Sequence, residues 1–299
     1  MSGKNQSPLL ATRLQYRINT NMTDDMLDVW AESAKYWTKY SDTIHKMFRP
    51  LTRALIERAG IGKGQTVLDV AGGAGEPSLT IAEEVGPQGS VTCTDGVAEM
   101  VDAARAEAQR RGLTNMQFRQ CAADFLPFAD NSFDVVVSRL GVMFFPDPVA
   151  AMREMLRVLR PNGRLAFAVW GKSDLNPFCY LVTRVMDQHL KSPAAEPEAP
   201  NAFRFAEPGK LATVMAQAGA IDAEEGVVSF DIEAPLSPIQ FWDMRSQTSD
   251  TLREKLVKLS AEEQAQIASE VEQAVNEFFP SNQMRFPAQL IIATGRKSV

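Results

Sequence analysis

Short β-branched apolar runs alternate with segments of helical spacing through the middle of the chain. The runs predict five strands, at residues 66–70, 90–94, 116–120, 133–138 and 164–170. Between them, apolar residues that recur every three or four positions predict helices at residues 77–85, 97–111 and 148–159. Strands that alternate with helices indicate a parallel sheet with right-handed crossovers, and therefore an α/β fold.

The chain before the first strand has helical periodicity alone. From Asp24 to Ala59 the apolar residues recur at threes and fours, and glycines follow. We therefore expect residues 1–60 to form an N-terminal helical cap, in which residues 1–20 are a polar segment.

The pattern becomes less regular after Trp170. In chain order, the expected elements are a Pro/Ala-rich loop at 191–202, a helix at 207–218, a strand near 225–232, a helical insert at 238–278 and a last strand at 285–296. We divide the chain into the cap, a core at residues 61–175 and a C-terminal part at residues 176–299, in which the insert forms a lid.

Composition narrows the function classes. The 299 residues are 45% hydrophobic and 23% charged, which is typical of an ordinary globular protein. A net charge of −6 argues against a nucleic-acid partner. No apolar run has membrane-spanning length and the N-terminus lacks the apolar core of a signal peptide, so we expect a cytoplasmic protein. The three cysteines are too dispersed for a disulfide framework or a zinc site, and we expect no metal.

Residues 67–82 carry the strongest chemical signal. The run Val67–Val70 predicts a buried strand, Ala71–Gly75 a tight turn, and Ser78 begins a helix. In an open α/β sheet this arrangement forms a ligand-binding crevice at the carboxyl edge. Asp69 stands at the strand end, where a carboxylate repels a pyrophosphate but suits an ammonium group. This favours S-adenosylmethionine over a dinucleotide.

The same segment resembles motif I of the class I S-adenosylmethionine-dependent methyltransferases, Asp-x-Gly-x-Gly-x-Gly. This chain has Asp69, Ala71, Gly73 and Gly75 at those places. Ala71 replaces the first glycine, a mild departure for a residue that keeps a negative φ. At Gly73 and Gly75 we expect a Cβ to crowd the turn or the ligand.

A second carboxylate follows the next predicted strand, at Asp95. At a strand end it can accept two hydrogen bonds from a ribose diol, a geometry that dinucleotide-binding folds share. A nicotinamide-dependent oxidoreductase is therefore an alternative. Against it, Ser78 stands where a dinucleotide site has a glycine, and Asp69 stands near the place of the pyrophosphate.

Two further segments resemble the ubiquinone/menaquinone C-methyltransferase branch (methyltransferase type 11). Residues 123–134 carry its acidic, Leu-Pro-Phe and Asn-Ser-Phe-Asp signature, and residues 157–165 carry its Leu-Arg-Pro-Gly-Gly turn with Asn162 for one glycine. Four pieces thus match in order over residues 66–170. The resemblance implies a Rossmann-like, seven-stranded, mostly parallel sheet with helices on both faces, an N-terminal helical cap and a helical insert before the last strand.

The resemblance also implies the cofactor contacts. Asp69 would order the turn and the methionine amine, and Asp95 would bind the ribose. Where the branch often has Asp or Asn for adenine, this chain has Ala122, which leaves the backbone and Asp124. Gly96 replaces a large apolar residue, so other apolar side chains would cover the adenine ring. The cofactor candidates are Asp69, Ala71, Gly72, Gly73, Gly75, Asp95, Gly96, Val97, Met100, Ala123, Asp124, Phe125 and Ser138.

Methyl transfer to a small molecule requires chiefly alignment of donor and acceptor, and a base only where the acceptor's proton is hard to remove. His45, in the cap, is the candidate base. The other histidine, His189, lies near a helix end, and an ordinary surface or capping role is the alternative for both.

Aromatic residues gather at the predicted carboxyl edge and in the insert, which suits an apolar or aromatic acceptor. Arg139 could anchor an acidic acceptor or the cofactor's carboxylate, or form a structural ion pair. Core packing is the alternative for each aromatic residue. The acceptor candidates are Tyr40, Arg139, Phe144, Trp170, Phe178 and Trp242.

These patterns predict an S-adenosylmethionine-dependent methyltransferase of small molecules that releases S-adenosylhomocysteine. A catalytically silent S-adenosylmethionine-binding regulatory protein is a second alternative, supported by Ala122 and Gly96. The sequence does not determine the acceptor or whether a carbon, oxygen or nitrogen atom is methylated. It also leaves the oligomeric state open, and a homodimer is one of the possible states.

Overall fold

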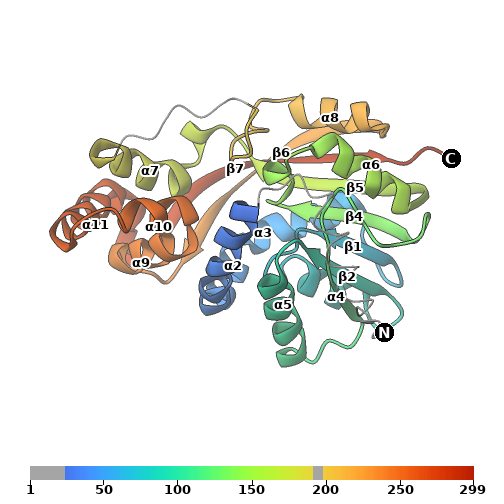
Figure 1. The fold of residues 1–299 in the computed structure, drawn as a ribbon, viewed down its shortest axis with the longest axis horizontal. Helices are drawn as coiled ribbons and strands as arrows, with labels where there is room; N and C mark the ends of the chain where they lie inside the picture. Colours follow the sequence, from blue (N-terminus) through green and yellow to red (C-terminus); the bar gives the residue numbers. More distant parts are fainter. Residues whose placement is uncertain (1–23, 191–197) are drawn as a thin grey trace, which may run out of the picture.

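The computed structural model describes residues 24–190 and 198–299. Within these ranges seven strands form one sheet in the order β3-β2-β1-β4-β5-β7-β6, with β1 to β5 parallel and β7 antiparallel to both neighbours (Figure 1). The strands are β1 (Thr66–Val70), β2 (Ser90–Asp95), β3 (Met116–Gln120), β4 (Phe133–Arg139), β5 (Leu159–Trp170), β6 (Ile221–Ala234) and β7 (Met284–Arg296).

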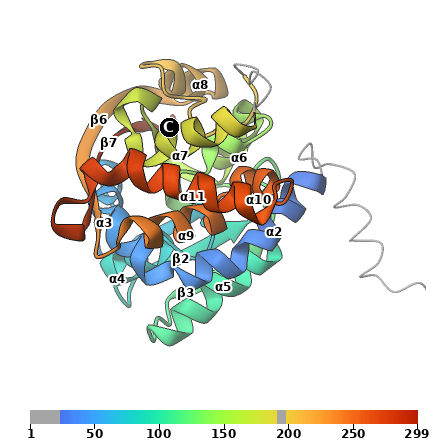
Figure 2. The same cartoon turned by 90° about the vertical axis from the view of Figure 1, so that its left-hand side faces the viewer.

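Helices cover both faces of this sheet. The chain moves outward from β1 to β3 and then outward in the other direction from β4 to β5, so right-handed crossovers place the connecting helices on opposite faces. Figure 2 shows α6 and α8 on the other side of the sheet from α4 and α5. The bounds are α4 (Ser78–Val85), α5 (Ala98–Arg110), α6 (Pro148–Val158), α7 (Pro177–His189) and α8 (Lys210–Ala218). Because both faces are covered, the central strands are continuous apolar runs.

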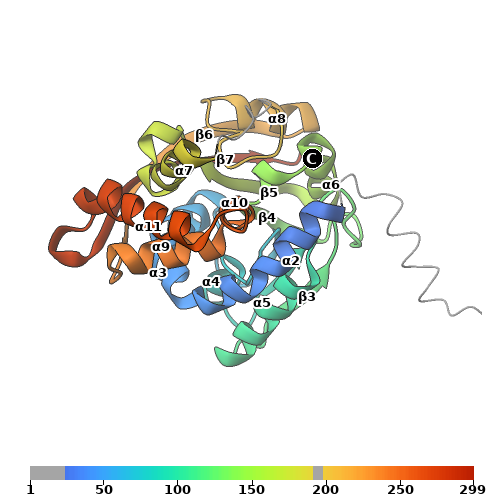
Figure 3. The same cartoon turned by 60° about the vertical axis from the view of Figure 1, so that its left-hand side comes forward.

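The N-terminal cap consists of two helices in the described residues, α2 (Asp24–Lys39) and α3 (Ser41–Ala59), which are separated at Tyr40. Helix α3 packs on β4, β5, β6 and β7, whereas α2 packs on α5 and lies beside α9 and α10 (Figure 3). The predicted polar segment at residues 1–20 lies outside the described residues.

The predicted insert comprises α9 (Pro238–Thr248), α10 (Asp250–Leu256) and α11 (Ala261–Val275). Capping boxes at Ser237 and Ser260 fix the starts of α9 and α11. The insert docks on the sheet through a cluster of phenylalanines around Phe286 of β7. The rings that contact Phe286 are Phe178, Phe241, Phe278 and Phe279.

Two strand starts and one helix show the main differences from the predictions. Strand β5 begins at Leu159 and not at residue 164, because Asn162 turns with a φ of 62° inside a strand whose first residue already pairs with Phe133. Strand β6 begins at Ile221 and not near residue 225. Helix α7 was not predicted, although its buried side chains have helical spacing: Phe178, Leu181, Val182, Val185 and Met186.

The predicted fold class is confirmed by this topology. Among the described residues, no helix is both long enough and apolar enough to span a membrane.

We predict that Phe286→Ala lowers the free energy of unfolding by about 3–5 kcal/mol, because it opens a cavity under four rings. Val227→Ala, on the exposed face of β6 where Val227 is 55% exposed, is the control. It should change the free energy by no more than about 0.5 kcal/mol. Urea unfolding followed by circular dichroism measures both. Equal effects of the two substitutions would contradict this role of Phe286.

Candidate functional site

The turn after β1 is attached to β2. Gly72 N–H donates to the carbonyl of Thr94 (2.9 Å), and Gly75 N–H closes the turn on the carbonyl of Gly72 (3.0 Å). A Cβ on Gly72 would lie 2.7 Å from both Asp69 Oδ2 and Cys93 Sγ, so this position requires glycine. Gly75 has a φ of 115°, and a Cβ there would lie 2.6 Å from Leu79. The predicted crowding at Gly75 therefore occurs within the turn.

The condition set for Ala71 is not met, and at Gly73 the turn itself leaves room for a Cβ, so crowding of the ligand there stays a prediction. Ala71 has a φ of 58°, in the left-handed region, and not a negative φ. Such a conformation costs an alanine about 1–2 kcal/mol. Gly141, after β4, makes room for its methyl group, since a Cβ on Gly141 would lie 2.7 Å from that of Ala71. At Gly73 a Cβ would meet no protein atom within 4 Å, so the protein requires glycine there for its φ of 53°.

Asp69 lies fully buried beneath the turn. Its Oδ2 accepts a hydrogen bond from the hydroxyl of Ser78 (2.6 Å), while its Oδ1 is buried without a partner in the described residues. Burial raises the pKa of Asp69 to about 7, although Ser78 and the charge of Arg139 act in the opposite direction. The position where a dinucleotide site has a glycine is therefore a serine that holds this carboxyl group.

Asp95 ends β2 and faces the same turn. Its Oδ2 accepts the N–H of Gly73 (2.9 Å) and its Oδ1 accepts the N–H of Val97 (3.0 Å). Burial raises the pKa of Asp95, and these backbone donors partly offset the effect. Each oxygen retains a lone pair, so the fixed carboxylate can also accept two hydroxyl groups.

Helix α2 covers this edge of the sheet. A Cβ on Gly96 would lie 3.1 Å from Leu27, and Trp30 contacts Phe144 with ring centres 5.5 Å apart. The predicted cofactor residues Val97 and Met100 are buried with Ala34 in an apolar cluster beneath α2. Leu27 and Trp30 were not predicted as site residues, and only their helical spacing could have indicated them.

The loop after β3 is more open. Phe125 is 49% exposed, and its neighbours Ala123 and Asp124 are partly buried. Burial raises the pKa of Asp124.

Buried polar atoms without partners gather at the same edge. Folded proteins leave few such atoms unpaired, so their gathering indicates a place for a polar ligand. In the described residues, those near the turn and the ends of β1 and β4, or under α2, are Asp69 Oδ1, Ser138 Oγ, Arg139 Nε and Trp37 Nε1.

Arg139 crosses from the end of β4 to the cap. It donates to Thr52 Oγ1 (2.8 Å) and to the carbonyl of Glu76 (3.2 Å), and its guanidinium lies 5.9 Å from the ring centre of Phe48. Burial lowers its pKa, and the charges of Glu76 and Asp69 partly offset this. Among the described residues it forms no salt bridge, so the structural ion pair is not observed.

His45 contacts a carboxylate that the sequence did not suggest. Its Nδ1 lies 2.7 Å from Oε1 of Glu76, which also binds Arg111 (3.0 Å) and Thr80 (2.7 Å). Burial alone would raise the pKa of Glu76, but the bond with His45 and the charge of Arg139 bring it below its usual value. His189 pairs with Glu270 of α11 (2.7 Å), where it joins two helices of the C-terminal part.

The predicted acceptor residues lie in different surroundings. Trp170 and Phe178 are buried and stack on each other, and both contact Phe48. Trp242 is buried in the insert, Phe144 lies beneath Trp30, and the hydroxyl of Tyr40 donates to Gln247 of α9 (3.2 Å). Phe48, Trp170 and Phe178, which we call the aromatic cluster, lie beside Arg139.

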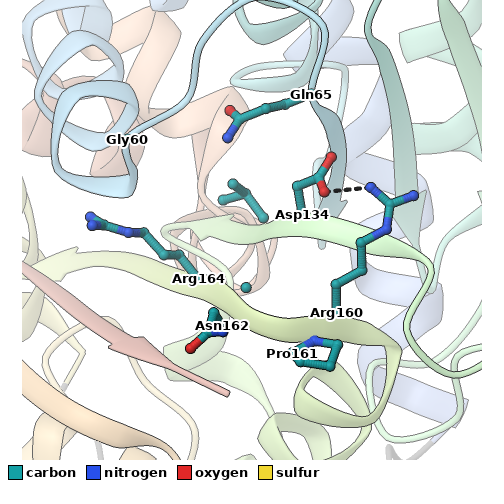
Figure 4. Close-up of a pocket in the computed structure, with 9 residues that line it drawn as sticks. Gly60, Gln65, Asp134, Arg160, Pro161, Asn162 and Arg164 are labelled. Carbon is teal, nitrogen blue, oxygen red and sulfur yellow. Dashed lines mark hydrogen bonds and ion pairs between the residues drawn. The ribbon is translucent and has the colours of Figure 1, made fainter. Parts of the chain in front are cut away.

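A concavity of about 330 Å³ lies elsewhere, at the amino ends of β1, β4 and β5 (Figure 4). Arg160 pairs there with Asp134, which also accepts the N–H of Thr66 (2.8 Å). It contains none of the predicted site residues.

Comparison with known proteins bears on the central part of the chain. Residues 61–198 match a family model described as a methyltransferase domain. A ubiquinone/menaquinone biosynthesis C-methyltransferase of Cellvibrio japonicus is 39% identical over 133 residues, which is 44% of this chain and 52% of that protein. An uncharacterised protein of Mycobacterium bovis is 41% identical over 131 residues, 44% of this chain and 46% of its own length. The chain thus spans about half the length of the curated relatives it matches.

Solved structures confirm the fold alone. The YcgJ protein of Bacillus subtilis superposes with a TM-score of 0.53 at 22% identity, covering 83% of this chain and 98% of that one. A Haemonchus contortus phosphoethanolamine N-methyltransferase, solved with S-adenosyl-L-methionine, gives 0.53 at 16% identity, covering 95% and 60%.

We predict that Asp69 makes stability fall as the pH rises toward neutrality. Its pKa is about 7 in the folded protein, against an ordinary value of 3.8 in the unfolded chain. Between these values the folded state holds a proton that the unfolded state has lost, so stability decreases up to about pH 7 and is then level. Between pH 5.5 and pH 8 the free energy of unfolding of the parent protein should therefore fall by about 2 kcal/mol. The Asp69→Asn variant should not show this decrease.

Urea unfolding at the two pH values measures this difference. Ser78→Ala should raise the pKa of Asp69 further, because it removes a hydrogen bond to the carboxylate. Identical pH dependence in the parent protein and in Asp69→Asn would contradict the assignment.

Proposed function

We propose that this chain, whose residues 61–198 match a family model described as a methyltransferase domain, transfers a methyl group from S-adenosylmethionine to a small apolar or aromatic acceptor. The observation that supports this most is the gathering of unpaired polar atoms around the turn that Asp95 holds. Relatives named as ubiquinone/menaquinone biosynthesis C-methyltransferases support carbon as the methylated atom.

The residues present fit the cofactor. Asp95 would accept the ribose hydroxyls, and the open space at Gly73 would admit the cofactor beside the turn. Asp69 carries an unpaired oxygen for the methionine ammonium group, and Arg139 an unpaired N–H for its carboxylate. With Ala122 in place of an acidic or amide residue, adenine would rely on the backbone, Asp124 and the apolar cover of α2.

Two alternatives are less well supported. The alternative of a catalytically silent binding protein was supported by Ala122 and Gly96. However, Leu27 of α2 occupies the space that Gly96 leaves. The nicotinamide-dependent oxidoreductase would place a pyrophosphate near the buried Asp69, which has no cation bonded to it among the described residues.

The cofactor would supply an electrophilic methyl group. The chain would align the acceptor with it and exclude water, for which α2, α3 and the insert are placed over the carboxyl edge.

His45 would act as the base where the acceptor must lose a proton. Glu76 holds a proton on Nδ1 of His45, which leaves Nε2 to accept one from the acceptor. Arg111 and Thr80 in turn hold Glu76, so the orientation of the imidazole is fixed.

We predict that the protein binds S-adenosylhomocysteine in the micromolar range and that Asp95→Asn weakens this at least about tenfold, since a ribose contact to a charged group is lost. Asp102→Asn, at a side chain that is 72% exposed in α5, is the control and should leave the affinity unchanged. Isothermal titration calorimetry measures all three. Absence of binding by the parent protein would refute the proposed function.

We predict that His45→Gln lowers kcat by about 100-fold with an acceptor found by screening with S-[methyl-³H]adenosylmethionine, because a proton acceptor is removed. The affinity for S-adenosylhomocysteine should stay the same. His189→Gln breaks a His–Glu pair with the same 2.7 Å separation elsewhere in the fold and serves as the control. If both variants retain full kcat, His45 is not the base.

A further inference from the structure

A second arginine lies on the aromatic cluster without an anionic partner. Arg245 of α9 lies over Phe178, with its guanidinium 4.8 Å from the ring centre. Its Nε is buried, and its side chain makes no hydrogen bond or ion pair in the described residues. The residue as a whole is part-buried, so its guanidinium is partly removed from water without an anion to compensate for the lost hydration.

The protein does not lack carboxylates for this role. The chain carries 37 Asp and Glu residues against 31 Lys and Arg. Other arginines of the same region do find them: Arg253 pairs with Asp250, and Arg285 with Asp231. The titratable group whose charge acts on the pKa of Arg245 is Cys179, and burial raises the pKa of that thiol to about 11, so it stays neutral. No carboxylate of the described residues pairs with Arg245, which leaves its guanidinium available to an anionic ligand.

The position of Arg245 connects it with the proposed active site. Phe178 stacks on Trp170, the last residue of β5, and contacts Phe48, over which Arg139 lies. Arg139 and Arg245 thus lie over neighbouring rings of one aromatic cluster. Arg139 already donates to Thr52 and Glu76, whereas every donor of Arg245 is unused among the described residues.

We propose that the methyl acceptor is an anion, an apolar or aromatic molecule with a carboxylate, and that Arg245 binds this carboxylate. The proposal rests on the proposed function. The contact with Phe178 holds the guanidinium over the ring, and its N–H groups, which no described residue accepts, can form two parallel hydrogen bonds to one carboxylate. The aromatic cluster would contact the apolar part, and Arg139 would remain with the cofactor. A neutral quinol ring would leave Arg245 unpaired.

Matched acids and amides test the charge requirement. The probes are phenylacetate, indole-3-acetate and 1-naphthylacetate, each with its amide, titrated into the full chain saturated with S-adenosylhomocysteine. We expect at least one acid to bind at least about tenfold more tightly than its amide, because a desolvated charge pair forms. Arg245→Gln should remove this preference and leave the affinity for the amide unchanged. Arg245→Lys, which keeps the charge without the planar fork, should retain part of it.

Arg184→Gln is the matched control. Arg184 lies over Tyr180, 5.7 Å from the ring centre, on the exposed face of α7, so its loss removes the same charge and the same type of stacking. It should leave the preference for acids intact. If no acid is preferred, or if Arg245→Gln and Arg184→Gln have equal effects, the proposal is wrong.

Binding of S-adenosylhomocysteine separates this failure from failure of the proposed function. A parent protein that does not bind it refutes the methyltransferase itself. A parent protein and an Arg245→Gln variant that bind it equally, without any preference for acids, refute only the anionic acceptor. Equal binding also establishes that the variant is folded.

Discussion

Hydrogen bonds between the turn after β1 and the end of β2 fix the position of the other groups in the site. Parallel pairing of β1 with β2 brings Asp95 level with the turn, where it accepts the N–H of Gly73, while Gly72 donates to Thr94. The turn then directs the chain into α4, so that Ser78 reaches back to Asp69. A carboxylate that binds its own backbone in this way is oriented before any ligand arrives, which reduces the ordering that binding requires.

Departures from the motif are compensated by residues distant in sequence. Ala71 adopts the left-handed conformation of a glycine, and the space for its methyl group comes from Gly141 after β4. Gly96 lacks a large side chain, and Leu27 of α2 fills the place. In both cases a glycine on one segment leaves room for a larger side chain on another segment. The departure from the motif at one position is therefore compensated by a residue elsewhere in the chain.

The same long-range dependence decides what the sequence could predict. Strands and motif glycines follow from local patterns, since buried runs and tight turns leave signals within a few residues. The φ of Ala71, the contact of Glu76 with His45 and the cover by Leu27 each depend on packing between segments 31 to 70 residues apart, for which a single chain gives no signal. Phe178 illustrates the reverse problem: its aromatic character suggests the acceptor pocket, a role that stays a prediction, and the same ring also joins the insert to β7. Composition alone cannot distinguish these roles.

The charged side chains that lack an ionic partner have one physical property in common. Asp69 is buried and Arg139 and Arg245 are part-buried, in a chain with enough opposite charges to pair them, and burial shifts the pKa of each toward its neutral form. Such groups destabilise the empty protein and are stabilised only by a ligand that brings the complementary charge. In the proposed function, a cofactor with both an ammonium and a carboxylate group would complement Asp69 and Arg139 together. Arg245 lies beyond them on the aromatic cluster, and the charge that complements it belongs to the second substrate.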